Sequence, residues 1–168
     1  MARASKRDHI VAEATQLFLT QGFKGTSIDL VVSTCAVSKP TVYNHFPDKA
    51  VLVAAVIETW LEEHKPSTDI SCASEDTLWA YLDQYWWCDQ HMAMYRLIIA
   101  EGWRFAAAAD RFWREFDARW QKVALRALST HFAYSLTEAQ DKVDAIRWRR
   151  LLLSMPVNAV SSAVSECD

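Results

Sequence analysis

The sequence contains very little glycine and proline, with three Gly and four Pro among 168 residues. It also lacks segments in which Val, Ile and Thr alternate with polar residues, the pattern typical of half-buried strands. Because turns between strands usually need Gly, Pro, Asn or Asp at short intervals, this scarcity argues against a β-rich fold. We therefore predict an all-α protein.

Long apolar segments and clustered cysteines are also absent. The longest apolar run, residues 50–57, is too short to span a bilayer, and residues 1–9 contain no apolar segment that would target secretion. The four cysteines, at positions 35, 72, 88 and 167, have no paired spacing that would indicate a zinc site or a disulfide framework. We expect a cytoplasmic protein with free or buried thiols, no metal, no cofactor and no membrane partner.

The charge of the chain is unevenly distributed. Residues 1–50 carry six Lys and Arg against four acidic residues, whereas the rest of the chain carries twelve basic against seventeen acidic residues. The hydrophobic content of 51% excludes a disordered chain. A basic N-terminal region on an acidic body is typical of a protein that presents one end to nucleic acid.

Residues 26–49 contain the strongest pattern in the chain, two short amphipathic helices separated by a tight turn. The first helix has one apolar stripe at spacing i, i+3, i+4 and i+7, made of Ile28, Val31, Val32 and Cys35. Thr26 or Ser27 supplies the side-chain oxygen that caps the first free N–H groups. We predict that this helix is buried and that residues 36–37 form the turn.

The second helix begins at Ser38 and directs Val42 and Phe46 inward, at spacing i and i+4. Its outward side chains offer a cation, hydroxyls and an amide, which match the phosphate oxygens and base edges of DNA. Lys49 adds a cation at the N-terminus of the next helix, a position that favours anions. The candidate DNA-contacting residues are Thr26, Ser27, Ser38, Lys39, Pro40, Thr41, Tyr43, Asn44, His45 and Lys49.

These residues and the helix before them resemble the TetR family of bacterial transcriptional regulators. The matching positions are Ile10, Ala14, Leu17, Phe18, Gly22, Phe23, Thr26 and Ser27, then Val37 to Lys39, Thr41 to Tyr43, His45, Phe46 and Lys49. The resemblance implies a homodimeric repressor that binds a palindromic double-stranded DNA operator and is released by a small-molecule effector. Val32 stands where the family usually has Ala, and Ala36 stands where it has Gly, so we expect strain of roughly 1 kcal/mol in the turn.

The remaining pattern predicts further helices over about 6–21, 48–64, 74–90, 92–103, 110–131 and 137–155, the last opened by a capping box of Thr137 and Gln140. Residues 95–105 and 112–113 resemble the C-terminal domain of the AefR-like subgroup. We predict a helix-turn-helix DNA-binding domain in 1–50, a linking helix in 51–64, and a helical effector-binding and dimerisation domain in 65–168. We expect the last dimerisation helix to be cut short after Pro156.

Seven of the eight tryptophans lie in the predicted C-terminal domain. One interpretation is a pocket for an apolar or aromatic effector, with His91, Glu101 and Arg104 as candidate polar contacts. The other interpretation, core and dimer packing, fits the pattern equally well. The candidate pocket residues are Trp86, Trp87, Met94, Ile98, Glu101, Trp103, Phe112 and Phe116.

Catalysis has no support in the sequence. The pairs His91 with Glu101 and His131 with Glu138 have no spacing that acid–base chemistry requires, and no nucleophile motif or Gly-rich phosphate loop accompanies them. We expect a non-enzymatic protein. The alternative to a DNA-binding regulator is a helical dimerisation or adaptor protein with a degenerate DNA-binding head.

Overall fold

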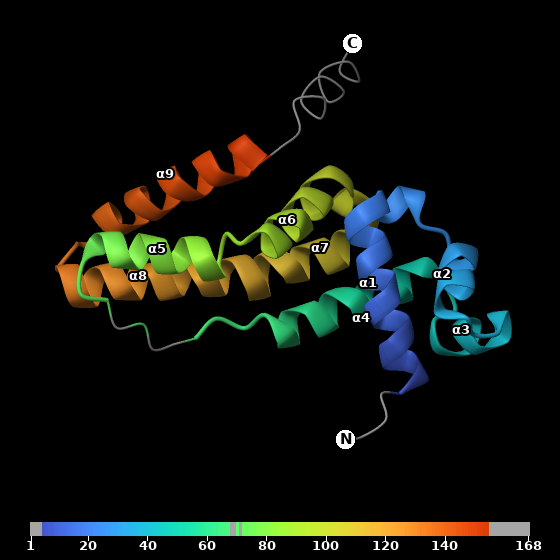
Figure 1. Ribbon diagram of the computed structural model, residues 1–168. Helices are drawn as coiled ribbons and strands as arrows, with labels where there is room; N and C mark the ends of the chain where they lie inside the picture. Colours follow the sequence, from blue (N-terminus) through green and yellow to red (C-terminus); the bar gives the residue numbers. More distant parts are fainter. Residues whose placement is uncertain (1–4, 68–69, 71, 155–168) are drawn as a thin grey trace, which may run out of the picture. The chain divides into compact units, whose positions relative to one another are not determined.

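The computed structural model describes residues 5–67, 70 and 72–154, and every element in these residues is helical (Figure 1). The chain divides into two compact units. The first unit consists of Met1–Lys65 and Leu97–Trp113, and the second of Pro66–Arg96 and Arg114–Asp168. The predicted all-α class is confirmed. None of the described helices is long and apolar enough to cross a membrane.

The first unit begins with three helices that each start at a serine cap. These are α1 (Lys6–Gly25), α2 (Ile28–Cys35) and α3 (Lys39–His45), capped by Ser5, Ser27 and Ser38. Inside α1, Gly22 has φ 76° and ψ 168°, so the regular helix breaks there before one further turn. Such a conformation is open to glycine and strained for other residues, which explains why the helical pattern of the sequence stops near residue 21.

Helix α4 (Lys49–Glu63) is capped by Asp48 and supplies much of the core of the first unit. The helix predicted over 48–64 thus has one buried apolar face, made of Leu52, Val53, Ala55, Val56, Ile57, Trp60 and Leu61. Helix α4 packs against α1 and against α7 (Ala106–Phe112). The sequence pattern gave no sign that residues 97–113 join the N-terminal helices in one compact unit.

The second unit is built from α5 (Glu75–Tyr85), the first part of α6 (Asp89–Glu101), α8 (Ala118–Phe132) and α9 (Leu136–Ser154). Helix α8 packs against both α5 and α9. The contact stripe of α9 consists of Ala139, Val143, Arg147 and Leu151, which recur every four residues and are all buried. The core of this unit therefore lies along α8.

The helices of the C-terminal part differ from the prediction in three details. Helix α5 ends at Tyr85 rather than near Gln90, because the N–H groups of Trp86 and Trp87 both donate to the Leu82 carbonyl and close the last turn. A short 3₁₀ helix (Gly102–Phe105) follows α6, and a π-helical turn (Trp113–Asp117) joins α7 to α8, where the pattern had predicted one helix.

The cap of α9 also differs from the prediction. Ser135 and Glu138 form the reciprocal capping bonds, with the Glu138 N–H donating to Ser135 Oγ at 3.3 Å and the Ser135 N–H donating to Glu138 Oε2 at 3.0 Å. These residues have the same i, i+3 spacing as Thr137 and Gln140 but lie two positions earlier. Pro156 and the predicted end of this helix lie outside the described residues.

Candidate DNA-binding site

Helices α2 and α3 are joined by a left-handed residue. Ala36 has φ 52° and ψ 34°, and its N–H donates to the Ser33 carbonyl at 3.4 Å. This is the turn conformation that the resemblance to the TetR family implies, formed here with alanine in place of glycine. Ser27 Oγ accepts from the Leu30 N–H at 3.0 Å and Ser38 Oγ from the Thr41 N–H at 3.4 Å, so both helices begin at the predicted caps.

The inward face of α3 holds the helix in place. Val42 is fully buried and Phe46 is 1% exposed, as the i, i+4 spacing predicts. The Arg7 guanidinium lies 5.6 Å from the centre of the Phe46 ring, which adds a cation–π contact from α1. A helix of only seven residues has little stability of its own, so these tertiary contacts fix its position.

The outward face of α3 and its flanks is polar and open to solvent. Thr41 is half-buried, and its hydroxyl is 2.8 Å from that of Ser38, so it extends the cap rather than the open face. The exposed members of the predicted set are Ser27, Ser38, Lys39, Pro40, Tyr43, Asn44 and His45. Most of the predicted contact residues are therefore accessible to solvent.

A residue that the sequence analysis did not select, Asp29, shapes the charge of this surface. Lys39 Nζ lies 2.7 Å from Asp29 Oδ1, and both side chains are well exposed. The hydrogen bond to Asp29 raises the pKa of Lys39, and the ammonium also lies 5.7 Å from the centre of the Tyr43 ring. Because exposed pairs of this kind are weak, Lys39 remains available to a phosphate.

Two predicted contact residues have internal roles instead. Thr26 is fully buried, and its hydroxyl donates to the carbonyl oxygens of Gly22 at 3.0 Å and Leu17 at 3.2 Å, so its side chain is not part of the open surface. The Lys49 ammonium donates to the Phe23 carbonyl, and burial lowers the pKa of Lys49. Both side chains thus satisfy backbone carbonyls of α1 near its break.

Glu101, a candidate effector contact, also supports the break in α1. Its Oε2 accepts from the Lys24 N–H at 2.5 Å, within the first unit. The glycine at position 22 leaves room for this carboxylate, because a Cβ there would lie 2.4 Å from Glu101 Oε1. The carboxylate therefore fastens the end of α6 to the segment that precedes the helix-turn-helix.

The other candidate pocket residues do not line one cavity. Trp86, Met94 and Phe116 are buried in the second unit and Ile98 and Phe112 in the first, while Trp103 is 70% exposed. Trp86 stacks between Trp87 and Trp120, with ring centres 4.6 Å and 6.0 Å apart. These positions favour the packing interpretation that the sequence left open.

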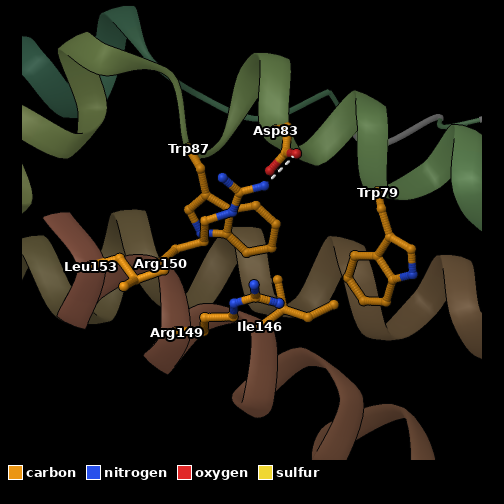
Figure 2. A pocket seen from close by; sticks show the side chains of 7 residues that line it. All are labelled: Trp79, Asp83, Trp87, Ile146, Arg149, Arg150 and Leu153. Carbon is orange, nitrogen blue, oxygen red and sulfur yellow. Dashed lines mark hydrogen bonds and ion pairs between the residues drawn. The ribbon is translucent and has the colours of Figure 1, made fainter.

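A cavity of about 280 Å³ does open in the second unit, between α5 and α9 (Figure 2). Of the predicted pocket residues, only Trp87 is among the residues that line it. The lining residues are Trp79, Asp83, Trp87, Ile146, Arg149, Arg150 and Leu153. Spacing could have indicated this site, because the α9 residues fall at i, i+3, i+4 and i+7 and two α5 residues at i and i+4.

A buried polar cluster lies elsewhere in the second unit. Asp117, 3% exposed, accepts from Arg147 Nε at 2.9 Å, from the Tyr95 hydroxyl at 2.7 Å and from Gln121 Nε2 at 2.6 Å. The indole N–H of Trp86 donates to the Tyr95 oxygen at 2.9 Å. Burial, together with the Asp117 charge, raises the pKa of Tyr95, so the phenol stays protonated and keeps donating.

No group of His, Cys, Asp and Glu residues in the described part of the chain is arranged to hold a metal ion. Cys35, Cys72 and Cys88 are free thiols, and Cys167 lies outside the described residues.

Comparison with curated proteins finds relatives that match part of the chain. The chain is 32% identical over 63 residues to the HTH-type transcriptional repressor DhaR of Mycobacterium sp. (strain GP1), a match that covers 38% of this chain and 32% of DhaR. It is 29% identical over 58 residues to the HTH-type transcriptional activator FasR of Mycolicibacterium smegmatis, covering 34% of this chain and 26% of FasR. The chain thus spans about a third or less of the length of these relatives.

Solved structures match along most of the chain. The Flavonoid-responsive Regulator FrrA has a TM-score of 0.62 and 25% identity, with 95% of this chain and 91% of that chain covered. A transcriptional regulator from Aquifex aeolicus VF5 has a TM-score of 0.55 and 20% identity, with 92% and 88% covered, and shows the fold alone. Residues 10–56, which include α2 and α3, match the family model for bacterial regulatory proteins of the tetR family. Residues 10–56 are thus a tetR-family helix-turn-helix region, and the solved structures share the fold of the chain.

Proposed function

We propose that this protein is a sequence-specific DNA-binding repressor that acts as a homodimer on a palindromic operator. The observation that carries the proposal is the anchored α3 helix, whose Val42 and Phe46 are buried while Lys39, Tyr43 and Asn44 remain exposed. An exposed cation suits phosphate, and an exposed Asn offers a donor and an acceptor to a base edge. A packing hairpin would have no need of this polar surface.

The second unit supports the proposed homodimer. Helix α9 exposes Trp148 by 55% and Leu152 by 64%, at spacing i and i+4 on one face. Contiguous exposed apolar side chains on a soluble protein usually mark an interface. We place the partner copy on this face, and a palindromic operator would require two α3 helices to enter successive major grooves about 34 to 36 Å apart.

The sign of regulation and the effector belong to the same proposal. The curated relatives include a repressor and an activator, and each of these two matches covers less than two fifths of this chain. Repression needs only operator occupancy, so we propose it first. A small aromatic effector is proposed because FrrA, which matches over 95% of this chain, is named for its response to flavonoids.

Selection of DNA fragments by the purified protein tests the function. We expect enrichment of a palindrome. Asn44→Ala should then reduce the preference for that palindrome by about 1 to 3 kcal/mol, because a base contact is lost.

Lys39→Ala should weaken binding to all sequences about equally and lower the salt slope by roughly 1 unit, with Lys122→Ala on α8 as the matched control. Absence of any enriched sequence would favour the alternative, a helical adaptor with a degenerate head.

Sedimentation measures the dimer independently of DNA. Leu152→Glu should convert a dimer into a monomer, because a carboxylate would be buried in the apolar face. Asp141→Asn, at an exposed position nearer the other end of α9, is the control. A wild-type protein that sediments as a monomer at micromolar concentration would refute the dimer.

A further inference from the structure

The cavity between α5 and α9 has two indole walls. Trp79 and Trp87 extend from the α5 side, and Ile146 and Leu153 line the cavity from α9 (Figure 2). Flat aromatic and aliphatic surfaces of this kind favour a planar apolar ligand, which stacks on indole faces with little loss of conformational freedom. The volume of about 280 Å³ limits the ligand to one or two fused rings.

The two arginines that line the cavity differ in their hydrogen-bond partners. Arg150 is held by Asp83, with Arg150 Nη2 2.5 Å from Asp83 Oδ2. Arg149 is exposed and forms no hydrogen bond or ion pair with any residue in the described part of the chain. The cavity therefore contains one uncommitted guanidinium beside apolar walls.

The N–H groups of the two cavity-lining indoles also differ in whether they have an acceptor. Trp79 Nε1 donates to Glu75 Oε1 at 3.0 Å. The Trp87 side chain is buried, with 7% of the residue exposed. Its Nε1 has no hydrogen-bond acceptor among the described residues. Buried N–H groups normally have a partner, and this donor, which has none in the described part of the chain, belongs to a side chain that lines the cavity.

We propose that this cavity binds a planar aromatic carboxylate. The ring lies against Trp79 and Trp87, the carboxylate pairs with Arg149, and a ligand oxygen accepts from Trp87 Nε1. A guanidinium binds a carboxylate in a bidentate geometry that a neutral ligand does not match. The identification of this ligand as the effector rests on the proposed function, whereas the binding site itself rests on the cavity.

Isothermal titration calorimetry with naphthoate and its neutral analogue naphthamide tests the site on the full chain. Wild-type protein should bind one naphthoate per chain and prefer it to naphthamide by about tenfold, the difference expected for a charge-assisted hydrogen bond. Arg149→Gln should abolish this preference while naphthamide binding stays within about twofold. Arg126→Gln, an exposed arginine of α8 that does not line the cavity, should leave both affinities unchanged.

A second variant addresses the indole donor. Trp87→Phe keeps an aromatic wall but removes the N–H, so naphthoate affinity should fall about fivefold to tenfold. Equal binding of naphthoate and naphthamide to wild type, or equal naphthoate binding by wild type and Arg149→Gln, would overturn the proposal. So would a failure of naphthoate to bind at millimolar concentration.

Operator binding by the same preparations separates this inference from the proposed function. Specific DNA binding without naphthoate binding would refute the proposed ligand site and support the DNA-binding function. Naphthoate binding with the predicted Arg149 dependence, but with no specific DNA binding, would support the ligand site and refute the regulatory function.

Discussion

The helix-turn-helix and the Asp117 cluster place their polar side chains in opposite ways. In α2 and α3 the capping bonds join residues three apart, and the remaining polar groups face solvent. Around Asp117 the partners come from α6, α8 and α9, up to 30 residues away, and all the charge is buried. The polar groups that we propose to contact DNA are thus positioned by local bonds, whereas those that hold the second unit together depend on contacts between distant parts of the sequence.

The largest expected effect comes from the buried cluster. Asp117→Asn leaves Arg147 without its carboxylate, and breaking a buried pair typically costs about 3 to 5 kcal/mol in the free energy of unfolding. Urea unfolding followed by circular dichroism measures this loss. Asp141→Asn, at an exposed position of α9, should change stability by less than about 0.5 kcal/mol. Similar small losses in both variants would show that the cluster contributes little.

The first unit has its own strained position at Gly22. Gly22→Ala should destabilise the protein by about 1 to 3 kcal/mol, because φ is 76° and the new Cβ would collide with Glu101. Gly25→Ala is the matched control, since its Cβ would make only an ordinary contact at 3.5 Å with Gln21. If Gly22→Ala unfolded at the same urea concentration as wild type, the break in α1 would not constrain this unit.

Left-handed alanines occur in both units and allow a direct comparison. Ala36 has φ 52° and Ala133 has φ 55°. Replacement of either by Gly should raise the free energy of unfolding by up to about 1 kcal/mol, whereas Ala107→Gly inside α7 should lower it by a similar amount. Melting temperatures of the three variants test this, and a loss of stability in Ala36→Gly would contradict the strain assigned to the turn.

The smallest effect concerns acid stability. Lys142, with Tyr134 and Trp79, holds the pKa of Glu75 below its usual value. A lowered pKa means that the stabilisation is present above the ordinary Glu pKa of about 4.3 and is lost as the pH falls through the lower folded value. Glu75→Gln should therefore reduce the stability difference between neutral pH and about pH 3, by less than about 1 kcal/mol. Glu63→Gln is the control, and an unchanged pH profile in Glu75→Gln would contradict the prediction.

These contrasts explain which features could be predicted from the sequence. Features that depend on spacing within one helix could be predicted. They are the caps at Ser27 and Ser38, the inward positions of Val42 and Phe46, and the apolar stripe of α4. Two other features depend on the break in α1 at Gly22, and no sequence pattern specifies the φ angle of that residue. They are the buried position of Thr26 and the hydrogen bond that Lys49 donates to the Phe23 carbonyl.

The second unit was harder to predict for the same reason. Abundant tryptophan indicated a pocket or a core but not which indoles face which space, because that choice depends on how α5, α8 and α9 pack. The π-helical turn at Trp113–Asp117 changes the register of every later residue in α8, so helical spacing counted from Phe112 fails beyond it.

The Asp117 cluster also constrains how this chain can diverge. Tyr95, Gln121 and Arg147 all donate to one carboxylate, so the loss of Asp117 removes an acceptor from three donors at once. A lineage can abandon the cluster only by replacing these side chains nearly together, for example with apolar residues of similar volume. Among homologous sequences, positions 95, 117 and 147 should therefore vary as a set, while the residues of the α3 surface can each change singly as operators change.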